Sequence, residues 1–134
     1  MRLSTLAQQT LDNFAQQAGW EQRARLLLQY AEQLPALTEN EQHADNQIHG
    51  CQSQVWLVID NTNPLACRIN SPARLLKGLF ALLLIRINGL NPTELTQLDI
   101  HDWFTQLGLQ KQLSPSRANG LNAVYQAILQ QVNR

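Results

Sequence analysis

The segment Val55-Trp56-Leu57-Val58-Ile59-Asp60-Asn61-Thr62-Asn63-Pro64-Leu65-Ala66-Cys67-Arg68-Ile69-Asn70 decides the fold class of this chain. Its first five residues are apolar, and most are β-branched or aromatic, a composition that favours a strand. The Asp-Asn-Thr-Asn-Pro run that follows is typical of a turn. Apolar and polar residues then alternate over residues 65–70, which predicts a return strand. The segment therefore predicts an antiparallel β-hairpin.

The same stretch predicts the register of the hairpin and a third strand. A turn at Thr62-Asn63 would place Cys67 opposite Val58. We expect Gln47-Ile48-His49 to add a short strand before a corner at Gly50-Cys51. The sheet would then have three antiparallel strands.

Helical patterns flank the hairpin on both sides. The stretch 73–88 is apolar almost all round, which indicates a buried central helix. We expect Ser71 to cap this helix, with Pro72 at its first helical position. Similar capping side chains begin other helices, and the full set of expected helices covers residues 3–17 (cap Ser4), 20–34, 73–88, a short helix from 92 (Asn91 with Glu94), 100–107 (Asp99) and the stretch from 115 onward (Ser114).

These elements predict an α+β fold, in which a small three-stranded antiparallel sheet packs against several helices. The length and the absence of internal repeats or linkers fit a single domain over residues 1–134.

The composition excludes several classes of protein. The 134 residues include 10 basic and 10 acidic side chains, and the zero net charge argues against nucleic-acid binding and a basic membrane surface. No stretch reaches the roughly 20 apolar residues that span a bilayer, and the first residues lack the apolar core of a signal peptide. Two cysteines are too few for a disulfide scaffold or an iron–sulfur cluster. We expect a soluble, cytoplasmic protein with reduced thiols.

The two cysteines differ in their sequence surroundings. Cys51 follows Gly50 at a corner where successive backbone N–H groups can stabilise an anion, but a small buried hydrophobic role is equally compatible with the local sequence. Cys67 lies in the middle of a strand, and in the expected register it is about 23 Å from Cys51, at roughly 3.3 Å per residue. A disulfide needs Cα atoms within about 7 Å, so we expect no bridge and a packing role for Cys67.

Other chemistries find little support in the residue pattern. His43 and His49 are a weak match to the spacing of a zinc site, and no glycine-rich phosphate loop is present. His49 lies two residues before Cys51 and either tunes the thiol or is an exposed strand histidine. A cysteine–histidine hydrolase stays open, because its histidine can come from anywhere in the chain.

The run Asn46-Gln47-Ile48-His49-Gly50-Cys51-Gln52-Ser53-Gln54-Val55-Trp56-Leu57 resembles the signature of the SufE/CsdE family of sulfur acceptors. Three further stretches agree in order and spacing, so the resemblance covers nearly the whole chain. They are Trp20-Glu21 leading to Gln33-Leu34-Pro35-Ala36-Leu37, then Lys77-Gly78-Leu79, and Leu113-Ser114-Pro115-Ser116-Arg117 with Gly120-Leu121.

The resemblance implies a fold, a function and a set of site residues. The fold would be SufE-like and related to NifU/IscU-type folds. Cys51 would accept persulfide sulfur from a pyridoxal-phosphate-dependent cysteine desulfurase (SufS/CsdA-like), stimulate that enzyme, and pass the sulfur to an acceptor such as an iron–sulfur scaffold. The chain itself would be an accessory protein rather than an enzyme, with no cofactor or metal of its own. We expect Gly50, Gln52, Ser53 and Arg117 to support Cys51, with Arg117 holding the loop or the persulfide charge.

The sequence departs from the family pattern at two positions. Pro72 stands where many members have an acidic residue, and Gln112 where a histidine is common. Two other functions compete with the carrier: an independent cysteine-dependent enzyme, and a binding module that activates a desulfurase without carrying sulfur. For the carrier, we expect Cys51 to be largely sheltered in the resting protein.

Overall fold

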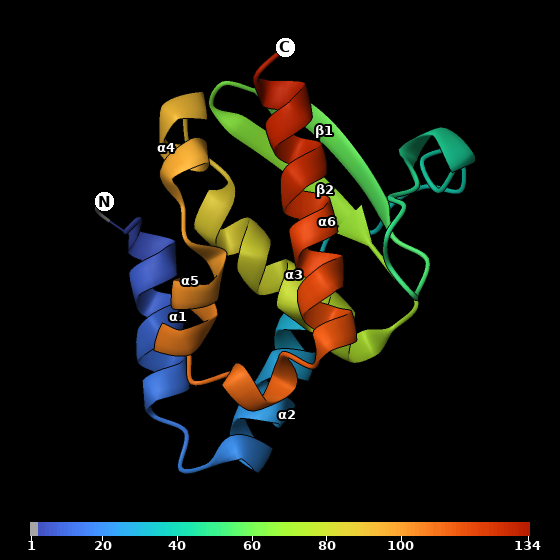
Figure 1. Ribbon diagram of the computed structural model, residues 1–134. Helices are drawn as coiled ribbons and strands as arrows, with labels where there is room; N and C mark the ends of the chain where they lie inside the picture. The colour runs from blue at the N-terminus through green and yellow to red at the C-terminus, as the bar shows by residue number, and fades with distance from the viewer. Residues whose placement is uncertain (1–2) are drawn as a thin grey trace.

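The computed structural model describes residues 3–134 and confirms the α+β class. Figure 1 shows the hairpin on one side of the helices α3 and α6, with α1, α4 and α5 on the other. In chain order the elements are α1 Thr5–Ala15, α2 Trp20–Glu32, the 3-10 turn η1 Ala44–Asn46, β1 Trp56–Thr62, β2 Leu65–Asn70, α3 Arg74–Ile87, α4 Pro92–Gln97, α5 Ile100–Gln106, the 3-10 turn η2 Gln110–Gln112, and α6 Pro115–Val132.

The sheet of the described residues has two strands, so the expectation of a third is wrong. Gln47 forms only an isolated bridge with Trp56, and the Ile48 N–H donates to the Val55 carbonyl at 2.8 Å. The chain then turns away at Gly50, which has a φ of 95°, so pairing ends after this one bridge. Residues 47–49 thus hold the base of a loop instead of extending the sheet.

The hairpin register differs by one residue from the expected one. Cys67 lies opposite Ile59, and Val58 lies opposite Arg68. The turn is at Asn63-Pro64 rather than Thr62-Asn63, and a bulge between Ile59 and Asn61 shifts the later pairs. A bulge of this kind leaves no signal in the alternation of apolar and polar residues.

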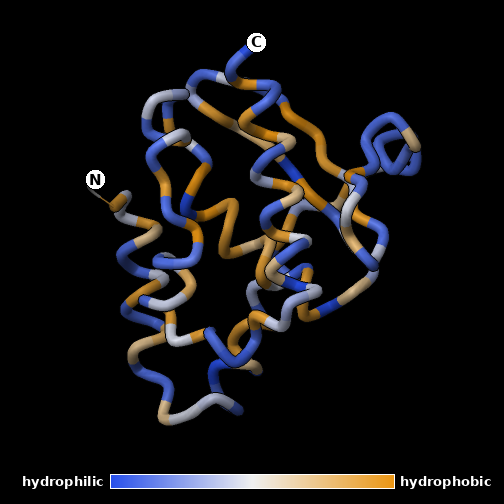
Figure 2. The backbone as a smooth tube through the Cα atoms, in the orientation of Figure 1, coloured by the Kyte–Doolittle hydropathy of each residue, from blue (hydrophilic) through white to orange (hydrophobic). Residues whose placement is uncertain are grey.

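Helix α3 is the buried centre of the molecule, as the sequence predicts. Figure 2 shows its backbone mostly in the colour of hydrophobic residues, and α2, β2 and α6 pack around it. Gly78 permits the close approach of α2, because a Cβ at this position would lie 2.7 Å from the Leu27 carbonyl oxygen. Ten residues of α3 are buried: Leu76, Gly78, Leu79, Phe80, Ala81, Leu82, Leu83, Leu84, Arg86 and Ile87.

The start of α3 is where the capping prediction is wrong. The helix begins at Arg74 behind the N-cap Ala73, and no side chain among residues 3–134 caps it. The Ser71 hydroxyl instead accepts a hydrogen bond from the Ala73 N–H at 3.3 Å, two residues along the chain. Pro72 therefore belongs to the turn before the helix. The helix starts at Arg74, and its first N–H groups are left without a side-chain acceptor.

The other expected caps are confirmed. Ser4 accepts from the Ala7 N–H at 3.1 Å, and Asn91 forms a reciprocal capping box with Glu94. Asp99 and Ser114 cap α5 and α6 in the same way. These contacts are local, which is why the sequence is sufficient to predict them.

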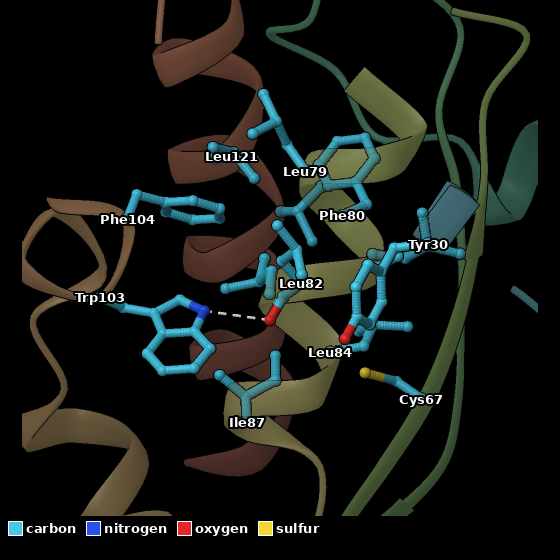
Figure 3. Packing of buried hydrophobic residues seen from close by; sticks show 14 of the residues in the cluster. Tyr30, Cys67, Leu79, Phe80, Leu82, Leu84, Ile87, Trp103, Phe104 and Leu121 are labelled. Carbon is cyan, nitrogen blue, oxygen red and sulfur yellow. Dashed lines mark hydrogen bonds between the residues drawn. The ribbon is translucent and has the colours of Figure 1, made fainter. Parts of the chain in front are cut away.

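The core joins the helices to the inner face of the hairpin. In Figure 3 the Trp103 indole N–H points to the Leu82 carbonyl, and the two groups are 3.1 Å apart. Phe80, Phe104 and Cys67 belong to the same buried cluster. None of the described helices is long and apolar enough to cross a membrane.

Candidate functional site

Cys51 lies in a loop of residues 48–55, which we call the Cys51 loop. The hydrogen bond from Ile48 to Val55 closes its base next to β1. Gly50 supplies the left-handed backbone conformation just before the cysteine, a conformation that costs glycine little. The short closed base and the glycine hold Cys51 away from the sheet and against other parts of the chain.

The Cys51 sulfur rests on α6. Its Sγ lies 3.8 Å from the Gly120 carbonyl oxygen, and a Cβ at Gly120 would be 3.6 Å from the sulfur. The side chain is half-buried, so it is neither sealed in the core nor fully exposed. Burial raises the pKa of the Cys51 thiol, because desolvation disfavours the thiolate. The resting side chain is therefore a protonated thiol at neutral pH.

Beside this thiol lies a pocket of about 530 Å³, which we call the Cys51 pocket. Three segments that are far apart in the sequence form it: the Cys51 loop, the start of α3 and the start of α6. In Figure 1 these two helix starts lie at the same end of the molecule. The lining residues are Cys51, Gln52, Ser53, Ala73, Arg74, Leu75, Leu76, Ser114, Ser116 and Arg117.

The charge of the Cys51 pocket is positive. Arg74 and Arg117 line it, and no acidic residue does. The Arg117 guanidinium donates one hydrogen bond to the Gln112 carbonyl at 3.2 Å. Among residues 3–134, neither arginine forms an ion pair with a carboxylate. Both guanidinium groups are thus available to an anion in the pocket.

The comparison with known protein families shows the family to which the chain belongs. A sequence model of the SufE family, described as an Fe-S metabolism associated domain, matches residues 8–132. The chain belongs to the SufE family. This membership associates it with iron–sulfur metabolism as an accessory domain.

A solved structure supports the fold of this SufE domain. The solution structure of a hypothetical protein from Thermus thermophilus is similar with a TM-score of 0.75 and 22% sequence identity. The similarity covers 98% of this chain and 96% of the other. At this identity the likeness concerns the fold alone.

The structure brings together most of the predicted site residues of the SufE domain. Cys51, Gln52, Ser53 and Arg117 all line the Cys51 pocket, whereas Gly50 shapes the loop without lining it. Sequence reasoning missed Arg74. It lies in the first turn of α3, and only the three-dimensional convergence of α3 with α6 places it beside Cys51.

The histidines do not join the site. His49 is exposed and is not among the residues that line the Cys51 pocket. His43 Nδ1 accepts from the Asp45 N–H at the start of η1. Within the described part of the chain, no group of three or more His, Cys, Asp or Glu side chains could hold a metal ion.

Cys67 occupies a different environment in this SufE domain. It is 3% exposed, and its thiol donates to Asn88 Oδ1 at 3.4 Å. The same Asn88 carboxamide accepts from the Cys67 N–H and donates to its carbonyl, so it pairs with the outer edge of β2. Burial, together with the nearby Asp60 carboxylate, raises the pKa of Cys67 to about 12. Both cysteines are free thiols.

Proposed function

We propose that the protein is a sulfur carrier, in which Cys51 takes persulfide sulfur from a pyridoxal-phosphate-dependent cysteine desulfurase and stimulates that enzyme. It then delivers the sulfur to an acceptor such as an iron–sulfur scaffold. The observation that carries the proposal is the position of Cys51 in a chain of the SufE family: half-buried at the wall of a positively charged pocket with no carboxylate in its lining. We also propose that it acts in the cytoplasm, where both thiols stay reduced.

In the proposed step, the Cys51 thiolate attacks the outer sulfur of the desulfurase persulfide. The bond between the two desulfurase sulfurs breaks, a new S–S bond forms on Cys51, and the desulfurase cysteine leaves as a thiolate. Desolvation holds the resting Cys51 in the protonated form. Movement of the Cys51 loop toward a partner would relieve that desolvation and favour the thiolate, so docking and activation of the nucleophile would be coupled.

Arg117 has a supporting role in this proposal. Its guanidinium bonds the Gln112 carbonyl in the turn before α6 and also lines the Cys51 pocket. It can therefore hold the shape of the pocket and stabilise the negative charge of the persulfide. Arg117→Ala should reduce both desulfurase stimulation and sulfur uptake, and unchanged values of both would contradict the role.

The decisive experiment uses the desulfurase from the same source and ³⁵S-labelled cysteine. Wild type and Cys67→Ser should acquire label, and Cys51→Ser should acquire none, because the persulfide forms on Cys51 alone. Cys67→Ser is the matched control, since its hydroxyl can replace the thiol as a donor to Asn88.

Three outcomes would contradict the proposal. Wild type without label would exclude the carrier. Full desulfurase stimulation by Cys51→Ser would favour a binding module that activates without carrying sulfur. Turnover of a small-molecule substrate without any desulfurase would favour an independent cysteine-dependent enzyme.

A further inference from the structure

The Cys51 pocket has the volume and the charge to hold a small anionic molecule in addition to the Cys51 persulfide. Its volume of about 530 Å³ falls within the roughly 300–1,000 Å³ that small-molecule sites occupy. Two arginines, Arg74 and Arg117, line it from two different helices. Since neither forms an ion pair within residues 3–134, an anion entering the pocket does not have to displace a carboxylate.

The backbone at the pocket wall adds to this charge. The first turn of α3 contributes Arg74, Leu75 and Leu76 to the lining, and no side chain in the described part of the chain caps that helix. The first turns of α3 and α6 contain no acidic residue. Helix starts carry partial positive charge, so both favour the same sign of ligand as the two arginines. Cys51 lines the same space.

We propose that the Cys51 pocket binds the carboxylate of a low-molecular-weight thiol, which removes the outer sulfur from a Cys51 persulfide. This inference rests on the proposed function, because it needs a persulfide on Cys51. The carboxylate lies between Arg74 and Arg117, which places the ligand's sulfur at the cysteine. The protein thereby also supplies a small, diffusible persulfide.

The reaction is a simple displacement. The thiolate of the ligand attacks the outer sulfur, the bond between that sulfur and Cys51 Sγ breaks, and Cys51 leaves as a thiolate that takes up a proton. One S–S bond is lost and one is formed, so no external oxidant or reductant takes part.

The test loads the persulfide chemically on the full chain in a Cys67→Ser background, so it does not depend on a desulfurase. An aromatic disulfide reagent forms a mixed disulfide with Cys51, and sulfide then displaces the aromatic thiolate. The rate of sulfur removal is measured with 3-mercaptopropionate and with uncharged 2-mercaptoethanol, each relative to its rate on the urea-unfolded persulfide. We expect the folded protein to prefer the carboxylate thiol by roughly tenfold, the worth of one charge-assisted hydrogen bond.

The arginine variants identify the site. Arg74→Gln and Arg117→Gln should each reduce the preference, and Arg74→Lys should retain most of it. Arg25→Gln removes the same charge from an exposed position on α2 outside the pocket and should change nothing. Iodoacetate and iodoacetamide give a second readout on the free thiol, since the anionic reagent should gain relative reactivity at Cys51 in the folded protein.

Three results would overturn the proposal. The first is an equal relative rate for the two thiols on the folded protein, and the second is a preference that survives both glutamine substitutions. The third is protection of Cys51 from iodoacetamide by an acidic peptide but not by the small thiols, which would mean that the pocket binds a protein carboxylate. Each of these results leaves the labelling of Cys51 by a desulfurase unaffected, and a failure of that labelling leaves this test intact.

Discussion

Cys51 and Cys67 have the same side chain in one small protein but very different surroundings. Cys67 points into the core from β2, is 3% exposed and has a hydrogen-bonded thiol. Cys51 is half-buried, contacts the Gly120 carbonyl through its sulfur and lines a positively charged pocket. Desolvation raises the pKa of both thiols, but Cys51 lies on a loop, whereas Cys67 lies in strand β2. The comparison predicts that the loop thiol is the more reactive of the two, because the other is enclosed in a packed sheet.

The largest expected difference between the two regions is in alkylation. At pH 8 and with iodoacetamide, Cys51 should react at least about 100-fold faster than Cys67, because a pKa of about 12 leaves almost no thiolate on Cys67. Burial of Cys67 slows the reaction further, since iodoacetamide reaches the thiol only when the strand opens locally. Mass spectrometry of peptides after timed quenching measures both rates.

Unfolding provides the control for this comparison. In 8 M urea the two cysteines should react at similar rates, because both surroundings are lost. Similar rates in the folded protein would mean that the hairpin opens readily, and the contrast between loop and core would then be wrong.

A second difference should appear when a methyl group is added to a glycine of each region. Gly78→Ala places a Cβ 2.7 Å from the Leu27 carbonyl oxygen and 2.8 Å from its Cγ, so α2 and α3 must separate. We expect a loss of roughly 1–3 kcal/mol in the free energy of unfolding, which urea titration measures. The gain in helix propensity of up to about 1 kcal/mol offsets only part of this strain.

Gly120→Ala is the matched substitution beside Cys51. Its Cβ would meet Leu76 at 3.5 Å and the Cys51 sulfur at 3.6 Å, which are ordinary contacts. Helix propensity then leaves the stability unchanged or raises it by up to about 1 kcal/mol. Equal losses from the two alanines would show that the Cys51 pocket is packed as tightly as the core.

The features that the sequence could predict are those that depend on local residues. Caps such as Ser4 and the Asn91–Glu94 box depend on residues three apart, and the apolar pattern of residues 73–88 is sufficient to place the central helix. The resemblance in residues 46–57 singled out Cys51. These predictions need only local sequence or a motif.

The features that the sequence could not predict depend on geometry between distant segments. The bulge near Asp60 shifts the register of Cys67, and Gly50 ends the pairing of residues 47–49 after one bridge. Arg74 joins the site only because the starts of α3 and α6 converge. The periodicity of apolar residues predicts each helix or strand separately and does not predict which elements contact one another.

The smallest expected effect is a decrease in the free energy of unfolding at alkaline pH, to which Cys67 should contribute more than Cys51. The pKa of Cys67 is about 12 in the folded protein against an ordinary value of 9.0. Above pH 9 the unfolded chain releases this proton while the folded protein keeps it, so the free energy of unfolding falls as pH rises from about 9 to about 12. Between pH 8 and pH 10 the loss should be roughly 1 kcal/mol. Urea titrations of Cys67→Ala should show this part of the decline removed, whereas Cys51→Ala, which removes a less buried thiol, should keep most of it. An equal decline in wild type and Cys67→Ala would mean that the pKa of Cys67 is the same in the folded and unfolded protein. Burial would then not account for the difference between Cys67 and Cys51.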